Sequence, residues 1–214
     1  MAGRPKTFDR SKLLNQAMAL FWRHGYQATS VRDIAKVAGL TTGTLYNEYE
    51  GKDGLFLAVL DHYLSHVITP RVEQILLSPV LPAHLSQHIQ DTPKDRIEYY
   101  LVSSIHGLPE EVAFQACLLL NTEAELNLDA HEHQALANVV RPGLLSIRGG
   151  FRHLLSLAQE YNQLSRSHSL DISLGQLEVF MTGLLMSAKA KQDSTKLLPI
   201  IHHFIHTLFN EREK

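Results

Sequence analysis

Hydrophobic residues recur every three or four positions along most of this chain, a spacing typical of amphipathic α-helices. The first series starts after Asp9, which can cap a helix, and stops near Gly25, which tolerates the left-handed backbone at a helix end. Its apolar positions are Leu13, Leu14, Ala17, Leu20 and Phe21. No convincing strand pattern appears, so the sequence predicts an all-α fold.

A second and a third helix follow closely. Ser30 and Asp33 form a capping box at the start of the second helix, which we expect to end at Gly39. Thr41 can cap the third helix, although the residues from Thr41 to Asn47 are weak helix formers. Packing against the first two helices must therefore stabilise the third.

The chain after this point continues with longer helices. A helix from Lys52 is expected to pass Pro70, and the stretch 76–95 is expected to be a loop because it contains three prolines. Further helices are predicted at about 94–106, 110–126 and 130–163. Pro142 and the pair Gly149 and Gly150 should kink or divide the last of these.

Two more helices are predicted at the C-terminal end. Ser173 and Gln176 resemble a capping box that opens a helix to about Ala190. The final helix is strongly apolar on one face, and Pro199 must lie in its first turn.

The steric pattern of residues 31–47 indicates a helix-turn-helix. Counted from Val31, Ala35 falls at position five, Gly39 at nine and Leu45 at fifteen. Ala35 lets the two helices cross closely, Gly39 permits a positive-φ turn, and Leu45 fills the angle between the helices. The exposed residues of the second helix would then be Thr42, Gly43, Thr44, Tyr46 and Asn47. Such small polar residues can approach DNA and hydrogen-bond to base edges and phosphates, whereas the alternative is a surface hairpin with coincidental spacing.

Charge and composition support this interpretation only weakly. The 214 residues have a net charge of −2, yet residues 1–52 hold eight Lys or Arg and four Asp or Glu, and the remainder holds 12 and 18. A basic N-terminal part suggests a polyanionic partner, although a solvated surface explains it equally well. The sequence has no apolar run of membrane-spanning length, no signal-peptide segment and a single cysteine. We therefore expect a cytoplasmic protein without a membrane partner.

About the first 60 residues resemble the DNA-binding head of the TetR family of bacterial one-component repressors. The residues at the family's motif positions are Phe21, Gly25, Tyr26, Thr29, Ile34, Ala35, Gly39, Gly43, Leu45, Tyr46 and Lys52. The resemblance implies a homodimeric, ligand-responsive transcriptional regulator, expected to be a repressor, that binds a near-palindromic DNA operator. It divides the chain into a three-helix head, residues 1–52, and a larger ligand-binding and dimerisation body, residues 53–214.

The resemblance also assigns the DNA contacts. Ser30, Arg32 and Lys52 would touch phosphates. The residues in the major groove would be Thr41, Thr42, Gly43, Thr44 and Tyr46. Glu48 departs from the family pattern, and Glu50 follows Tyr49, which replaces the usual Phe. Two carboxylates near phosphates would weaken non-specific binding; the alternative is that both point toward the protein, so neither is counted as a contact. A basic arm, Arg4 and Lys6, is a candidate for the minor groove.

For the body the resemblance implies a chamber for an unknown small-molecule effector and C-terminal helices that dimerise. Gly175, Val179, Gly183 and Ser187 form a stripe of small residues, so we expect a homodimer through about residues 173–210. The alternative is that both helices only complete the monomer core.

Candidate effector residues are aromatic or amphipathic residues on the expected inner faces, each of which could equally be core. They are Tyr99, Tyr100, His106, Phe114, Cys117, Leu118, Asn121, Phe151 and Phe180. The segment from Gln115 to Asn121 resembles one that some family members use to sense oxidants or electrophiles through a cysteine. A reactive Cys117 is therefore an alternative signal, and a buried structural Cys117 is the simpler interpretation.

Other functional classes lack support in the sequence. The histidines at 131 and 133 and the pair His202 and His206 have metal-like spacing, but no Cys pair or carboxylate motif accompanies them, so no metal or cofactor is predicted. No nucleophile elbow, P-loop, GxGxxG after a strand or HExxH is present, which argues against an enzyme.

Overall fold

The computed structural model describes residues 8–106, 117–164, 169–190 and 193–209, so the basic arm lies outside it. Within these ranges the chain is helical apart from its loops and one isolated bridge between Leu164 and Phe209. The prediction of an all-α fold is therefore confirmed. No helix in the described ranges is long and apolar enough to cross a membrane.

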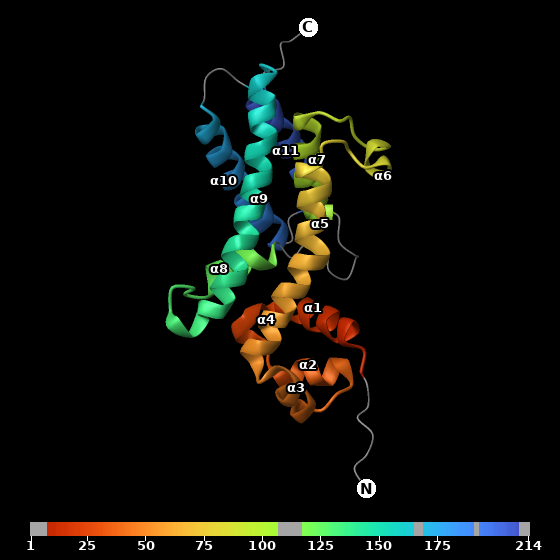
Figure 1. Cartoon of the computed structure of the whole chain (residues 1–214), viewed down its shortest axis with the longest axis vertical. Helices are drawn as coiled ribbons and strands as arrows, with labels where there is room; N and C mark the ends of the chain where they lie inside the picture. The colour runs from red at the N-terminus through yellow and green to blue at the C-terminus, as the bar shows by residue number, and fades with distance from the viewer. Residues whose placement is uncertain (1–7, 107–116, 165–168, 191–192, 210–214) are drawn as a thin grey trace.

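Three helices form the head at one end of an elongated molecule (Figure 1). They are α1 (Arg10–Ala28), α2 (Val31–Ala38) and α3 (Thr42–Tyr49). Asp9 caps α1 as predicted, since its side chain accepts the Lys12 N–H at 3.0 Å. Gly25 has the expected positive φ, 84°, and interrupts the helical geometry as predicted, although one further turn carries α1 to Ala28.

One long helix, residues 52–77, joins the head to the body, and we call it the lever. It consists of α4 (Lys52–Tyr63), the π-helical segment η1 (Leu64–Ile68), α5 (Thr69–Arg71) and the π-helical segment η2 (Val72–Leu77). It passes Pro70 as predicted. Because proline has no N–H to donate to the preceding turn, the backbone on both sides of it relaxes into wider π turns.

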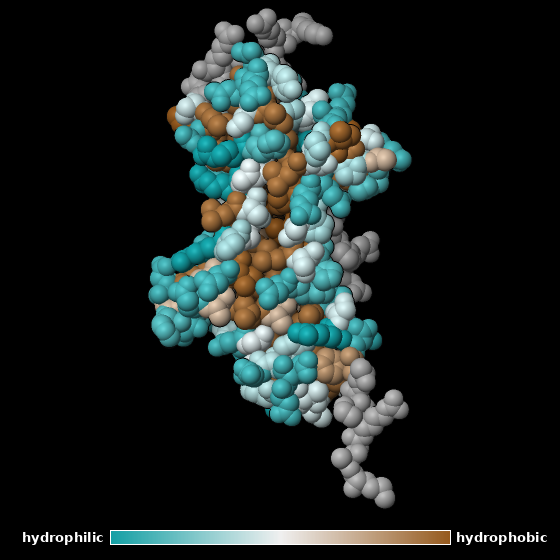
Figure 2. All heavy atoms as spheres, viewed as in Figure 1, coloured by the Kyte–Doolittle hydropathy of each residue, from teal (hydrophilic) through white to brown (hydrophobic). Residues whose placement is uncertain are grey.

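The remaining helices build the body around the lever. They are α6 (Ala83–Ser86), α7 (Pro93–His106), α8 (Leu118–Glu125), the short 3-10 helix η3 (His131–His133), α9 (Gln134–Glu160), α10 (Leu170–Lys189) and α11 (Ser194–Leu208). The long helix α9 lies alongside the lever and packs on α7, α8 and α10 (Figure 1). Figure 2 shows apolar atoms gathered between the lever and α9, whereas the tip of the head is largely hydrophilic.

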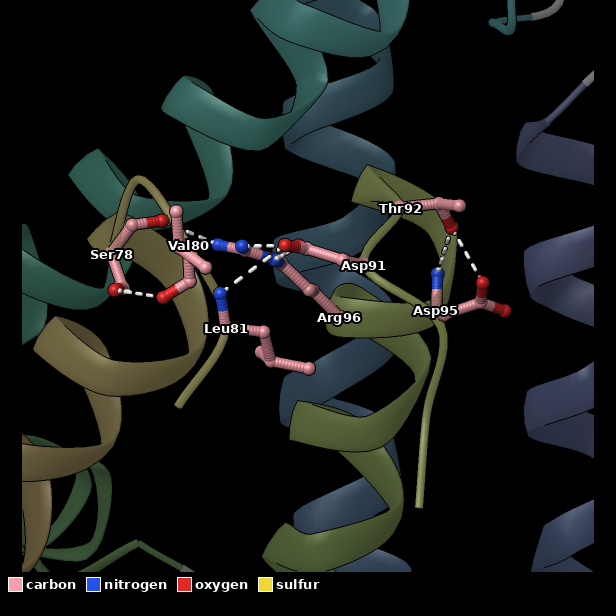
Figure 3. Close-up of polar contacts among 7 residues, drawn as sticks. All are labelled: Ser78, Val80, Leu81, Asp91, Thr92, Asp95 and Arg96. Carbon is pink, nitrogen blue, oxygen red and sulfur yellow. Dashed lines mark hydrogen bonds and ion pairs between the residues drawn. The ribbon is translucent and has the colours of Figure 1, made fainter. Parts of the chain in front are cut away.

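The connection between the lever and α7 is organised by one buried arginine. Arg96, 5% exposed, pairs with Asp91 and donates to the Ser78 carbonyl at 2.6 Å (Figure 3). Asp91 also accepts the Leu81 N–H at 3.2 Å. The predicted loop at 76–95 is thus only partly correct, because the lever extends to Leu77 and α6 forms within it.

Three predicted helix starts or turns are wrong. Helix α8 starts at Leu118 because Cys117 has an extended backbone, while residues 107–116 of the predicted helix lie outside the described ranges. Ser169 rather than Ser173 caps α10. Asp193 caps α11 and accepts the Thr195 N–H at 3.0 Å, which puts Pro199 in the second turn rather than the first.

Helix α9 is continuous, so Pro142 and the pair Gly149 and Gly150 do not divide it, which was one of the two predicted outcomes. Gly143 and Gly150 are buried against the lever. A Cβ at Gly143 would lie 2.6 Å from Leu64 Cδ2, and one at Gly150 would lie 2.8 Å from Leu76 Cβ. These glycines allow close packing of two helices rather than a break in one.

This packing predicts opposite effects for two adjacent substitutions. Gly150→Ala should lower the free energy of unfolding by about 1–3 kcal/mol, because the lever must shift to admit the methyl group. Gly149→Ala should be neutral or raise it by about 0.5–1 kcal/mol, because nothing lies within 4 Å and alanine favours a helix. Urea unfolding of both variants measures this, and equal effects would contradict the packing explanation.

Candidate nucleic-acid interface

The turn between α2 and α3 is defined by local hydrogen bonds. Ser30 caps α2 and accepts the Asp33 N–H at 3.1 Å. At the other end Gly39 is left-handed, with φ 67° and ψ 29°, and the Leu40 N–H donates back to the Ala35 carbonyl at 2.9 Å. This is a Schellman ending, in which glycine reverses the chain without steric cost. The predicted helix-turn-helix is present.

The angle between the two helices is filled as the sequence suggested. Ala35 is 3% exposed and Leu45 is 1% exposed, and both lie in the core of the head together with Phe21. The weak helix formers of α3 are therefore held by a buried leucine and by a cap, since Thr41 accepts the Thr44 N–H at 3.1 Å. Packing of the inner face stabilises α3, so the residues on its outer face need not contribute to the stability of the helix.

The outer face of α3 is polar and open to solvent. Thr42, Gly43 and Asn47 are exposed, and Tyr46 is 54% exposed. Thr44 differs, because it is half-buried and its hydroxyl lies 2.8 Å from the Thr41 hydroxyl. The structure thus brings together all of the predicted groove residues, with Thr44 the least accessible of them.

The predicted phosphate contacts flank this face. Arg32 is exposed at the start of α2, and the Ser30 hydroxyl donates to the Asp33 carboxylate at 2.5 Å. This hydrogen bond lowers the pKa of Asp33 below its ordinary value. Lys52 lies 4.3 Å from the centre of the Tyr26 ring and donates to the Gln27 carbonyl at 3.2 Å. Its ammonium group has three N–H donors, so Lys52 can still donate a hydrogen bond to a phosphate.

Both unusual carboxylates are exposed. Glu48 lies on the last turn of α3, and Glu50 caps that helix with a left-handed backbone, φ 58°. They are therefore positioned to repel a nearby phosphate backbone rather than to support the protein core.

The head is also tied to the body through its backbone. At Gly25 the backbone of α1 leaves helical geometry, and the Tyr26 and Gln27 N–H groups donate to the Glu125 carboxylate at 2.8 and 2.7 Å. A Cβ at Gly25 would lie 2.6 Å from Glu125 Oε2. Glycine is thus required both for the positive φ and for the approach of the carboxylate. Sequence reasoning missed Glu125, because nothing local links the end of α8 with the end of α1.

Two of the effector candidates share a small cavity in the body. Tyr100 and Cys117 line this space of about 30 Å³, which we call the inner cavity, together with Trp22, Tyr63 and Arg71. Burial raises the pKa of the Cys117 thiol, which disfavours the reactive thiolate. Sequence reasoning missed Tyr63 and Arg71, because their contacts with Cys117 and Tyr100 join residues far apart in the chain.

The other candidates lie elsewhere. Phe151 packs edge-on against Tyr100 and borders a second space of about 90 Å³, the side cavity. Tyr99 lines an open outer cleft of about 730 Å³. Phe180 stacks on Phe204, Leu118 is core, and Asn121 accepts a hydrogen bond from Lys189 at 3.2 Å. Phe114 and the side chain of His106 lie outside the described part.

The histidines do not gather into a metal site in the described residues, where no three His, Cys, Asp or Glu side chains are grouped to hold an ion. His202 instead pairs with Glu98 of α7.

Comparison with known proteins links the head to one family. The profile of the bacterial regulatory proteins of the tetR family matches residues 13–59. The HTH-type transcriptional repressor ComR of Escherichia coli is 48% identical over 73 residues, which are 34% of this chain and 35% of ComR. The match thus spans about a third of that relative. The uncharacterized HTH-type transcriptional regulator YezE of Bacillus subtilis is 25% identical over 80% of both chains.

Solved structures share the fold of the whole molecule. A cysteine mutant of the TetR family transcriptional regulator CifR, complexed with 26 bp double-strand operator DNA, superposes with a TM-score of 0.76 over 96% of this chain and 100% of that chain, at 19% identity. The reduced form of Escherichia coli NemR gives 0.69 over 96% and 98%, at 16% identity. The arrangement of a three-helix head on a helical body is therefore that of these regulators.

Charge on the α3 flank generates a test. Glu48→Gln should tighten binding to any duplex severalfold at low salt, since an exposed charge pair is worth roughly 0.2–1 kcal/mol, and the gain should fade as salt screens it. Titrations at two ionic strengths measure the effect. Glu160→Gln, on an exposed residue at the far end of α9, is the control, and an equal gain there would contradict a local effect.

Proposed function

Because this chain belongs to the TetR family of bacterial regulatory proteins, we propose that it is a transcriptional repressor that binds a near-palindromic operator as a dimer and is released by a small-molecule effector. The observation that carries the proposal is the outer face of α3, which is polar and exposed while its inner face is held by Leu45. The protein would act on DNA in the cytoplasm.

We assign sequence readout to α3 and positioning to its flanks. Thr42, Gly43, Tyr46 and Asn47 would contact base edges and adjacent phosphates in the major groove, with Thr41 and Thr44 at the start of the helix. The phosphate contacts would come from Ser30, Arg32 and Lys52. Two such heads would read half-sites about one helical turn apart, roughly 34 Å, or a multiple of it.

A homodimer is supported by the outer face of α10. Ile172, Val179 and Met186 are 52%, 76% and 37% exposed, and they share this face with Gly175 and Gly183, where an added Cβ would meet no atom within 4 Å. The opposite face of α10 packs in the monomer core. This outer apolar face of α10 would allow the same helix of a second copy to approach closely. We propose that the two α10 helices pair at the centre of an interface formed by residues 173–210.

The signal would travel from the inner cavity to the head along α8. This helix starts beside Cys117, at the cavity wall, and ends at Glu125, which holds the Tyr26 and Gln27 N–H groups of the head. An effector that binds better when α8 is displaced would loosen this clamp and favour a head spacing that does not fit the operator. Oxidation of Cys117 is the alternative trigger, but its raised pKa and burial make the reversible effector the better-supported one.

Selection from a random duplex library tests the DNA function. The full chain should enrich an inverted repeat at roughly physiological salt. Tyr46→Ala should then weaken binding to that repeat by about 1–3 kcal/mol per head, and by twice that in the dimer. Tyr161→Ala removes another exposed tyrosine, the residue that follows α9, and the variant should bind normally. Folded, dimeric protein that enriches no sequence would refute the repressor proposal.

Hydrogen exchange tests the clamp without the effector. Glu125→Ala should remove the protection of the Tyr26 and Gln27 amides and reduce operator affinity, because two hydrogen bonds to a charged group, each worth about 1.5–3 kcal/mol, are lost. Glu123→Ala, on an exposed residue of the same helix, should change neither. Normal protection in Glu125→Ala would show that α8 does not hold the head.

A further inference from the structure

The inner cavity lies where the head, the lever and the body meet. Its walls include Trp22 from α1, Tyr63 and Arg71 from the lever, Tyr100 from α7 and Cys117 before α8. Its volume of about 30 Å³ suffices for roughly two water molecules, or for a small polar group of a larger ligand. A ligand there would touch α1 of the head and the lever, and would lie at the start of α8.

Arg71 contributes a positive charge that no carboxylate in the described residues neutralises. The Nη2 atom donates to the Tyr100 carbonyl at 3.1 Å and to the Ser103 and Ser104 hydroxyls at 2.8 and 2.9 Å. All three acceptors are neutral, and the guanidinium lies 4.8 Å from the centre of the Tyr100 ring. Arginine has five N–H donors, and within the described ranges Nε and Nη1 have no acceptor. A half-buried guanidinium in this state favours an anion beside it.

Two buried tyrosines add further donors. Tyr100 is 3% exposed and lines the inner cavity, and no group in the described part of the chain accepts a hydrogen bond from its hydroxyl, which leaves that hydroxyl available to a ligand. Tyr63, also 3% exposed, donates only to Cys117 Sγ, a weak acceptor, at 3.7 Å. Burial raises the pKa of Tyr100 to about 12 and that of Tyr63 well above its ordinary value, so both hydroxyls keep their protons at neutral pH. The cavity is therefore rich in donors and poor in acceptors.

A mainly apolar space adjoins this polar end. Ile147 and Met181 line both the inner cavity and the side cavity of about 90 Å³. The other walls of the side cavity are the apolar residues Leu120, Leu144 and Phe151 and the polar residues Arg148, Glu178 and Thr182. Methionine is unbranched and adapts to new neighbours, so displacement of Met181 would join the two spaces. The combined site would then have a cationic end and an apolar end.

Building on the proposed function, we propose that the effector is an organic acid: its carboxylate, or an oxyanion of similar shape, binds Arg71 and the Tyr100 hydroxyl, and its apolar part extends past Met181. The Nε or Nη1 N–H group of Arg71 can donate a charge-assisted hydrogen bond to a carboxylate oxygen, and the phenol supplies a second hydrogen bond to the same carboxylate. Neutral molecules of the same shape would leave Arg71 without its counter-charge and bind more weakly.

The only tryptophan of the chain provides a local probe. Trp22 is 1% exposed and lines the inner cavity, so a ligand there should change its fluorescence. The full-length protein is titrated with propionate, benzoate and phenylacetate, each paired with its neutral amide. At least one acid should give a saturable change, with a Kd at least about tenfold below that of its amide, since a hydrogen bond to a charged group is worth more than about 1.4 kcal/mol.

Variants separate the charge from the shape of the site. Arg71→Met should abolish the preference for the acid over the amide, and Arg71→Lys should restore part of it, which distinguishes lost charge from lost structure. Tyr100→Phe should weaken the acid severalfold. Its matched control is Tyr99→Phe, whose ring lines the outer cleft, and which should bind as the unaltered protein does. Far-UV circular dichroism verifies the fold of each variant.

Three results would overturn the inference. They are equal affinity for acids and amides, unchanged preference in folded Arg71→Met, and no saturable change with any acid up to about 10 mM, the weakest affinity that a charge-assisted site should show. Operator binding is measured on the same protein: if it is intact while the acids fail, only the ligand class is wrong, and if no operator is found, the proposed function itself fails.

Discussion

The rest of the structure depends on one constraint: the lever is buried at both ends, in the core of the head and in the core of the body. At the head, Phe56 is 1% exposed and packs on Phe21 with ring centres 4.6 Å apart. At the body, Leu76 is completely buried against Gly150 of α9. Because one continuous helix belongs to both cores, the head cannot change its orientation without a shift of the lever or a loss of packing at one end.

The contacts beside the lever explain how such a shift is transmitted. Trp22 of the head packs edge-on against Tyr63 of the lever, and Tyr63 in turn faces the inner cavity. Glu125 independently holds the backbone of the head at Gly25. A ligand in the cavity thus meets a side chain that contacts the head and lies next to the helix that clamps it. The ligand can shift the position of the head only by as much as its affinity differs between the two positions of the head.

The two places assigned to function do not follow the usual pattern of protein structure. Helices are usually built from good helix formers, which the outer face of α3 lacks, and polar groups are usually paired, which is not so in the inner cavity. The α3 helix carries Thr, Gly and Asn outward, and the inner cavity holds a tyrosine hydroxyl without a partner among the described residues. Each departure lowers the stability of the free protein, and each is offset by nearby packing: Leu45 beneath α3, and Phe151 against Tyr100. Such local conflicts are expected where a partner completes the interactions.

The sequence alone determined the features that depend on neighbouring residues. The caps at Asp9, Ser30 and Thr41 and the turn at Gly39 follow from short-range hydrogen bonds and from the steric freedom of glycine, and all four were predicted. By contrast, Gly150 was interpreted as part of a break in α9, because only the lever packed against it shows that this glycine permits close approach. The meeting of Arg71 with Tyr100, and of Glu125 with Tyr26, joins residues 29 and 99 positions apart. Periodicity tells which face of a helix is buried, but only the tertiary structure decides which helix covers it, and so which polar groups meet there.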